Sequence, residues 1–257
     1  MIYYFSGTGN TKFVADCLAD SLHDELTDLA DFTRAGRPLR SESARPHVFL
    51  APIYAWRFPR VVEELIRKAA LSGSRDVYCV ATRESQSGRA GDYLRRIVEA
   101  KGLTFKGFTS VDMPNEYLLS DPVSPPEETA ACLRAILPEL RRLAERISGG
   151  LELSDHGNVG LPGVMSGIVN AAANRFLMTS GRFAVSDACV GCGACAKRCP
   201  MANIVMETGR PKFGKTCTWC FSCVQHCPQS AIDIGKRTVG KPRYVCPDYQ
   251  RFIKENA

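Results

Sequence analysis

Two cysteine runs in the last third of the chain constrain its fold and chemistry more than any other feature. Each run follows the pattern C-x-x-C-x-x-C-x-x-x-C-P. The first contains Cys189, Cys192, Cys195 and Cys199, and the second contains Cys217, Cys220, Cys223 and Cys227. Two residues between thiols allow a tight loop to direct successive sulfurs to different irons of one cluster, while backbone amides stay free to bond the cluster sulfide. The spacing therefore predicts iron–sulfur clusters and an electron-transfer function.

The spacing resembles that of the bacterial two-cluster ferredoxins, in which three thiolates of a run hold one 4Fe-4S cluster and the fourth reaches the other. For this chain the resemblance implies two 4Fe-4S clusters. One would be held by Cys189, Cys192, Cys195 and Cys227, and the other by Cys217, Cys220, Cys223 and Cys199. Structural zinc and disulfides are the competing interpretations, but zinc usually takes paired C-x-x-C ligands and disulfides require an oxidising compartment.

Four further cysteines, Cys17, Cys79, Cys132 and Cys246, share no ligand spacing. We expect the first three to be buried core thiols, because free cysteine is among the most buried residue types. Cys246 lies in a Val-Cys-Pro sequence after the second run, so a role in shielding a cluster stays open.

The length of 257 residues allows one substantial domain and a small one. We expect a first domain at 1–150, a linker with a packing helix at 151–183, and a cluster domain with a tail at 184–257. The formal net charge of +6 lies entirely in the last of these, which carries 11 basic and 5 acidic side chains. Each oxidised cluster carries about two negative charges, so the clusters would offset much of this excess. The charge therefore does not by itself indicate nucleic-acid binding.

The first residues read as an apolar strand rather than as a charged leader with a cleavage site. The longest apolar stretch, Leu161 to Met178, is interrupted by a proline and by polar residues, which is not typical of a membrane span. We therefore expect a soluble, cytoplasmic protein with reduced thiols.

The apolar segment at 1–5 is followed by a small, hydroxyl-rich loop and then by a helical pattern from Asn10 to Ser21. The loop resembles the flavodoxin phosphate loop, S/T-x-T-G-x-T, which wraps the terminal phosphate of FMN. The resemblance implies FMN binding by Ser6, Gly7, Thr8, Gly9, Asn10 and Thr11. The positive end of the helix dipole would add to the phosphate site. Neither the dinucleotide nor the ATP fingerprint is present.

Strand-like and helical segments alternate through the rest of this half, at His47 to Pro52, Pro59 to Ala70, Asp76 to Thr82, Ala90 to Lys101, and Thr104 to Met113. Such alternation predicts a parallel sheet with helices on both faces. A second strand is expected near Glu25 to Phe32, and a last helix within Glu127 to Ile147 that Pro138 kinks or restarts. The fold class is therefore α/β, a flavodoxin-like doubly wound parallel sheet, with a second, smaller α+β ferredoxin domain.

Flavin sites also need loops that hold the ring, and in open α/β sheets these lie beyond the carboxyl ends of the strands. The segment from Pro52 to Pro59 resembles the first flavodoxin ring-binding loop, and 83–91 follows the next strand. The candidate ring contacts are Pro52, Ile53, Tyr54, Ala55, Trp56, Thr82, Ser85 and Gly88. Tyr54 or Trp56 would stack on the ring, although simple loop packing explains such aromatics as well. The second loop lacks the usual aromatic, so the outer flavin face is expected to be open or covered by Tyr117 or the cluster domain.

A short apolar helix is expected near Val164 to Met178, and its alanines and large apolar side chains would pack the small domain on the first. As a whole, the chain resembles the fused flavodoxin-ferredoxin electron carriers of anaerobic bacteria and archaea. That resemblance implies an electron carrier that passes low-potential electrons between two 4Fe-4S clusters and FMN to a partner redox enzyme.

Two alternatives stay open at this point. In one, the flavin reduces a small acceptor such as a quinone, a nitro compound or oxygen, and the clusters supply the electrons. In the other, the first domain binds no FMN and serves as a docking module for a ferredoxin. No acid–base or nucleophilic constellation is evident in the sequence, so no catalytic residue is predicted.

Overall fold

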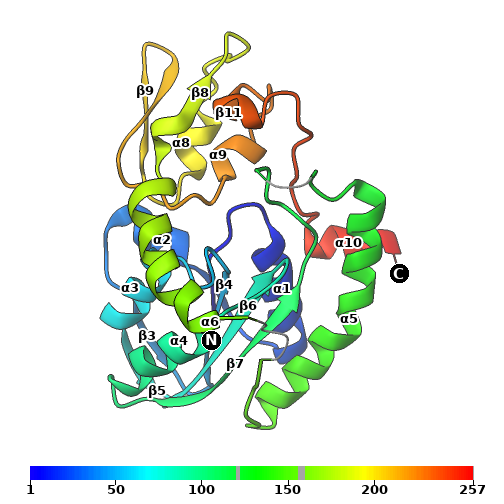
Figure 1. The fold of residues 1–257 in the computed structure, drawn as a ribbon. Coiled ribbons are helices and arrows are strands. Elements are labelled where there is room, and N and C mark those ends of the chain that lie inside the picture. The colour runs from blue at the N-terminus through cyan, green and yellow to red at the C-terminus, as the bar shows by residue number, and fades with distance from the viewer. Residues whose placement is uncertain (120–121, 156–159, 257) are drawn as a thin grey trace.

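The computed structural model describes residues 1–119, 122–155 and 160–256. Its first half contains a five-stranded parallel sheet in the order β2-β1-β4-β6-β7 (Figure 1). The strands are β1 (Ile2–Tyr4), β2 (Leu26–Asp28), β4 (His47–Pro52), β6 (Asp76–Arg83) and β7 (Thr104–Asp112). Ile2 pairs with Leu26 on one side and with Val48 on the other. The strand order reverses at β1, which confirms the doubly wound, flavodoxin-like fold.

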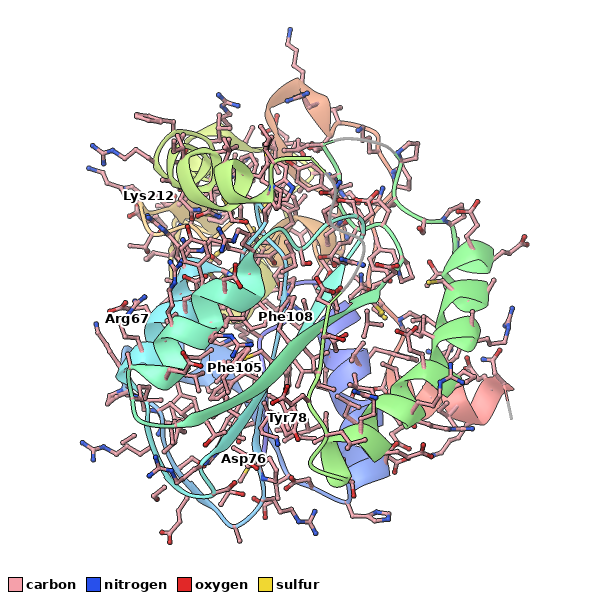
Figure 2. The ribbon with its side chains drawn as sticks, turned by 60° about the horizontal axis from the view of Figure 1, so that its bottom comes forward. Arg67, Asp76, Tyr78, Phe105, Phe108 and Lys212 are labelled. Atoms are coloured by element: carbon pink, nitrogen blue, oxygen red, sulfur yellow. The ribbon has the colours of Figure 1, made fainter. Side chains whose placement is uncertain are left out.

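Helices cover both faces of this sheet. The cluster of buried side chains that contains residues of α1 (Asn10–Leu22) and α5 (Pro126–Ser148) also contains Tyr78 of β6. A second cluster joins α3 (Arg60–Lys68) and α4 (Ala90–Glu99) to Phe105 and Phe108 of β7. Figure 2 shows Tyr78, Phe105 and Phe108 on these strands. The continuous apolar runs of β4 and β6 agree with a sheet that is buried on both faces.

Three parts of this domain differ from the sequence-based expectation. The predicted strand at Glu25 to Phe32 ends at Asp28, because the Asp28 carboxylate accepts a hydrogen bond from the Ala30 N–H and caps α2 (Leu29–Ala35). Helix α5 continues through Pro138 without a restart, with Leu133 and Leu140 buried on either side. Two short strands, β3 (Arg40–Ser43) and β5 (Ala70–Gly73), form a separate parallel pair that the pattern did not predict.

The second domain is built from two antiparallel strand pairs and two short helices. The strands are β8 (Phe183–Val185) with β11 (Ile232–Ile234), and β9 (Ile204–Glu207) with β10 (Arg210–Phe213). The helices are α8 (Ala194–Arg198) and α9 (Ser222–Gln225), accompanied by the single turns η3 (Ser180–Arg182) and η4 (Gly235–Arg237). The chain then returns to the first domain, where α10 (Tyr249–Asn256) lies beside α1 and α5 (Figure 1). The Phe13 ring meets Tyr249 and Phe252 edge-on, with centroids 5.4 and 5.5 Å away.

A helix at 162–177, called the linker helix here, joins the domains. It consists of α6 (Pro162–Val164), η1 (Met165–Val169), α7 (Asn170–Ala172) and η2 (Ala173–Leu177), and η1 and η2 are π-helical. Its packing is the reverse of the expectation: Ser166 and Asn170 are 0% and 2% exposed, whereas Ile168 and Phe176 are 76% and 71% exposed. Polar side chains therefore attach this helix to the protein. Within the described ranges, no helix is both long and apolar enough to cross a bilayer.

Leu50 provides a test of the role of the sheet as the support for the loops. This residue of β4 is fully buried, two residues before the first predicted ring loop. We expect Leu50→Ala to lower the free energy of unfolding by about 2 to 5 kcal/mol, because the cavity that it leaves adds to the lost burial. Anaerobic urea denaturation measures the change. Leu151→Ala, at a side chain that is 52% exposed, is the matched control and should cost far less; equal losses would contradict the placement of Leu50.

Candidate functional site

The eight predicted cluster ligands gather around two small hollows in the second domain. One hollow is lined by Cys189, Cys192, Cys195 and Cys227, and the other by Cys199, Cys217, Cys220 and Cys223. The fourth cysteine of each run thus lies with the first three of the other run. The backbone N–H groups of Asn203 and Ala231 each lie 3.3 Å from a cysteine sulfur, those of Cys199 and Cys227. In the described ranges, no three His, Cys, Asp or Glu side chains surround a position for a single metal ion.

A larger cavity, of about 450 Å³, lies between the two domains. Besides Asn10, its walls come from five separate segments of the chain. They are the first ring loop at 52–56, the second loop at 82–86, the segment at 113–117, the linker helix with Met178, and the cluster loop at 219–221. Cys220 therefore lines both this cavity and one of the cysteine hollows. A ligand in the cavity would be in direct reach of a cluster ligand.

The first ring loop is a tight turn that the linker helix holds in place. Tyr54 and Arg57 exchange two backbone hydrogen bonds, and the residues between them have positive φ angles, 48° at Ala55 and 63° at Trp56. Such angles are strained for side-chain-bearing residues and need support from their surroundings. The Asn170 amide donates to the Ala55 carbonyl at 2.8 Å, and the Ser166 hydroxyl donates to the Trp56 carbonyl at 3.0 Å. The buried polar face of the helix thus fixes this turn.

Aromatic side chains of the cluster loop form the opposite wall. The Tyr117 ring stacks on Phe221 with centroids 5.8 Å apart, and Phe221 lies 5.5 Å from Trp219. The Trp219 indole N–H donates to the carbonyl of Thr179, two residues after the linker helix, at 2.8 Å. Both elements that the sequence suggested as a cover, Tyr117 and the cluster domain, therefore line the cavity. The sequence did not reveal that the linker helix also contributes, through Val169, Ala173 and Leu177.

The predicted phosphate loop borders this cavity through Asn10, whereas Ser6, Gly7, Thr8, Gly9 and Thr11 are not among the lining residues. The Ser6 hydroxyl accepts from the Gly9 N–H at 3.1 Å, and the hydroxyls of Thr11 and Thr82 lie 2.8 Å apart. Of the other predicted contacts, Pro52, Ile53, Tyr54, Ala55, Trp56, Thr82 and Ser85 line the cavity. Gly88 instead lies against Trp56 and Ser166, where a Cβ atom would overlap the Ser166 hydroxyl.

Three buried polar atoms of the candidate site, two in the cavity wall and one in the predicted phosphate loop, lack a hydrogen-bond partner among the described residues. They are Thr8 Oγ1, the Tyr54 hydroxyl and Glu116 Oε2. Buried polar groups are nearly always hydrogen-bonded, so these atoms indicate a polar ligand. An unpaired hydroxyl in the loop before a helix N-terminus fits a phosphate, and an aromatic-lined cavity fits a flat ring. The residues present therefore fit a flavin with a phosphate group.

Glu116 is a site residue that the sequence did not reveal, since no motif contains it. Burial, with a smaller contribution from the Glu84 charge, raises the pKa of the Glu116 carboxyl to about 8. Burial likewise raises the pKa of Tyr54 well above its usual value. The Glu116 carbonyl accepts a hydrogen bond from the Gln225 amide at 2.8 Å, so its backbone is anchored to the second domain. A neutral carboxyl group therefore lies in the cavity wall at neutral pH.

The raised pKa gives Glu116 a characteristic effect on stability. The folded protein keeps this proton up to about pH 8, whereas an ordinary glutamate releases it near 4.5. The contribution to stability is thus complete below pH 4.5 and is lost as the pH rises to 8, at roughly 1.4 kcal/mol per pH unit. We expect Glu116→Gln to lose less stability than the parent between pH 5 and 8 in urea unfolding. The control is Glu139→Gln, at an exposed carboxylate, whose stability should change with pH as that of the parent does. A Glu116→Gln variant with the same pH dependence as the parent would contradict the prediction.

Comparisons with known proteins agree with this architecture. A family model described as a flavodoxin domain matches 1–106, and one described as a 4Fe-4S dicluster domain matches 183–228. No curated protein matches the chain.

Similar solved structures include flavodoxins and a larger oxidoreductase. A flavodoxin from Megasphaera elsdenii is 18% identical, with 56% of this chain and 99% of that chain covered and a TM-score of 0.33. A short-chain flavodoxin associated with a PDU bacterial microcompartment is 18% identical, with 58% and 95% covered and a TM-score of 0.35. Rubredoxin oxygen:oxidoreductase from Desulfovibrio gigas is 13% identical, with 58% and 36% covered and a TM-score of 0.33. The chain thus combines a flavodoxin domain with a 4Fe-4S dicluster domain, which matches the fused flavodoxin-ferredoxin family and supports an electron-transfer role.

Proposed function

We propose that this protein is an electron carrier in which two 4Fe-4S clusters exchange electrons with FMN and with redox protein partners. The observation that carries the proposal is the double position of Cys220, which lines both a cysteine hollow and the interdomain cavity. Transfer between redox centres slows steeply with distance, so a cluster ligand in the wall of the flavin cavity favours direct exchange. The proposal divides the chain into the flavodoxin domain at 1–150, the linker at 151–183 and the ferredoxin domain at 184–257.

The residues of the cavity have distinct roles in this proposal. Thr8 and the N-terminus of α1 would bind the phosphate, and Tyr54 and Trp56 would hold the ring. Bound FMN would supply the capacity to store one or two electrons, whereas each cluster carries one at a time. The neutral Glu116 carboxyl would donate a hydrogen bond within the cavity, where a charged carboxylate could only accept one.

The two clusters would serve different steps. Cys192 is exposed, whereas Cys220, which lines the cavity, is buried. The cluster held by Cys189, Cys192, Cys195 and Cys227 would therefore be the outer one, and it would exchange electrons with partners. Lys197 and Arg198 are exposed on α8 next to this set, which favours partners with acidic docking surfaces.

Covering of the cavity favours this proposal over a small-molecule reductase. The linker helix lines the cavity and is hydrogen-bonded to the first ring loop. A small-molecule reductase needs an open flavin face, and this helix would cover part of it. A docking domain without FMN is also disfavoured, because it would leave the Thr8 and Tyr54 hydroxyls buried and unpaired.

Cofactor content tests the proposal most directly. We expect anaerobically purified protein to contain about one FMN, eight iron and eight sulfide per chain, as two complete cubes require. Its reduced form should give cluster signals in the EPR spectrum. Full clusters without flavin after reconstitution would contradict FMN binding, and saturable turnover of a quinone or nitro compound at rates above those of protein acceptors would favour the reductase.

The assignment of the fourth cysteine of each run to the cluster of the other run can be tested by substitution. We expect Cys199→Ala to remove the same EPR signal as Cys220→Ala, and Cys227→Ala to remove the same signal as Cys192→Ala, because each pair would share one cluster. Iron content should fall by about four per chain in every case. Cys246→Ala, outside both hollows, should retain all the iron. If Cys199→Ala and Cys192→Ala instead remove the same signal and leave the other intact, each run binds one cluster by itself and the assignment is wrong.

A further inference from the structure

The C-terminal tail, residues 241–256, returns to the first domain and contacts the phosphate loop. The Cys246 backbone N–H donates to the Thr8 carbonyl at 2.9 Å. The Tyr244 hydroxyl donates to Asn10 Oδ1 at 2.6 Å, and Tyr244 is only 4% exposed. These contacts join residues that are more than 230 positions apart in the chain. The tail therefore contacts the loop at two successive points, Thr8 and Asn10.

The fit between tail and loop depends on Gly9. Its φ is 109°, and a Cβ atom there would lie 2.9 Å from the Cys246 Cβ. That separation is too short for two carbon atoms, so the tail can approach the loop only because the residue is glycine. The loop is thus closely backed by the tail.

The same contacts fix the groups that would face a phosphate. The Thr8 residue is 2% exposed, and its hydroxyl has no partner among the described residues. Its carbonyl is the one that the tail binds, so the tail fixes the peptide that carries this unpaired hydroxyl. Asn10, the first residue of α1, is held at its amide nitrogen by the Pro114 carbonyl at 3.0 Å and at its oxygen by Tyr244.

The tail is itself anchored to the ferredoxin domain. The Tyr244 N–H donates to the Gln225 side-chain oxygen at 2.8 Å, and Gln225 belongs to α9 beside the second cysteine run. The Lys241 ammonium group donates to the Leu118 carbonyl of the first domain at 2.7 Å, so the start of the tail is held by both domains. A rigid support of this kind reduces the ordering that a bound group would otherwise require.

We propose that Tyr244 and the Cys246 peptide are positioning residues of the flavin phosphate site, which hold Thr8 and Asn10 in the geometry that binds the phosphate of FMN. The inference rests on the proposed FMN site. Removal of the Tyr244 hydroxyl leaves the buried Asn10 oxygen without its donor, which weakens the site. Because the contact is to the phosphate loop, the effect should concern FMN and spare riboflavin, which has the same ring without the phosphate.

Equilibrium dialysis of the full-length protein under anaerobic conditions, with clusters intact, against FMN and against riboflavin tests this inference. We expect Tyr244→Phe to raise the Kd for FMN about tenfold and the Kd for riboflavin by less than about twofold. Tyr249→Phe is the matched control. It makes the same change in the same tail, but its hydroxyl donates to Asp20, at 3.3 Å, and not to the loop. Its FMN affinity should equal that of the parent.

Three results would overturn the inference: an unchanged FMN affinity in Tyr244→Phe, an equal loss for both flavins, or an equal loss in Tyr249→Phe. Failure of the parent protein to bind either flavin would instead refute the proposed FMN site. Hydrogen exchange of the unmodified protein provides a measurement that does not depend on the folding of a variant. Binding couplings are reciprocal, so FMN should slow exchange of the Cys246 amide more than riboflavin does, and equal effects of the two would also overturn the inference.

Discussion

The contact between Gly7 of the phosphate loop and Cys220 of the cluster loop is the constraint on which the rest of the structure depends. A Cβ atom on Gly7 would overlap the Cys220 carbonyl oxygen. Glycine therefore allows the backbone of a predicted cluster ligand to lie against the backbone of the predicted flavin loop. The two domains meet at their functional loops, and the buried side chains of the α1 face continue without interruption into the ferredoxin domain. Their relative orientation is accordingly part of the site.

The linker helix extends this arrangement to the far side of the cavity. An ordinary surface helix buries its apolar stripe, but here the buried residues are Ser166 and Asn170, which donate hydrogen bonds to the carbonyls of the first ring loop. The helix thereby supplies the cover that the aromatic-free second loop lacks. Polar residues suit the inner face of this helix, since the strained turn at Ala55 and Trp56 presents carbonyl groups to it rather than apolar surface.

Local patterns predicted much of the fold and part of the site. The cysteine spacing, the phosphate loop and the alternation of strands and helices are each encoded within a few residues. The sheet could therefore be predicted from the alternation, and the grouping of the cysteines from the resemblance to two-cluster ferredoxins. The contributions of Glu116 and Tyr244 could not, because each depends on a contact between segments far apart in the chain. The second strand was predicted to be too long for a local reason: Asp28 caps α2, so the strand ends there. Of the two effects expected of Pro138, a restart of the helix does not occur, because packing of the helix offsets the lost hydrogen bond.

Backbone strain indicates how strongly the site depends on contacts between the domains. Ala55 and Trp56 on one wall of the cavity, and Trp219 and Phe221 on the other, all have positive φ angles. Each such residue costs roughly 1 to 3 kcal/mol unless its surroundings determine its conformation. The turn at Ala55 is held by the linker helix, and Trp219 is held by Thr179, two residues after that helix. A flavodoxin domain separated from the linker would lose the support of the Ala55 turn, and a ferredoxin domain separated from it would lose that of Trp219. The covalent fusion therefore shapes the cavity as well as keeping its two domains together.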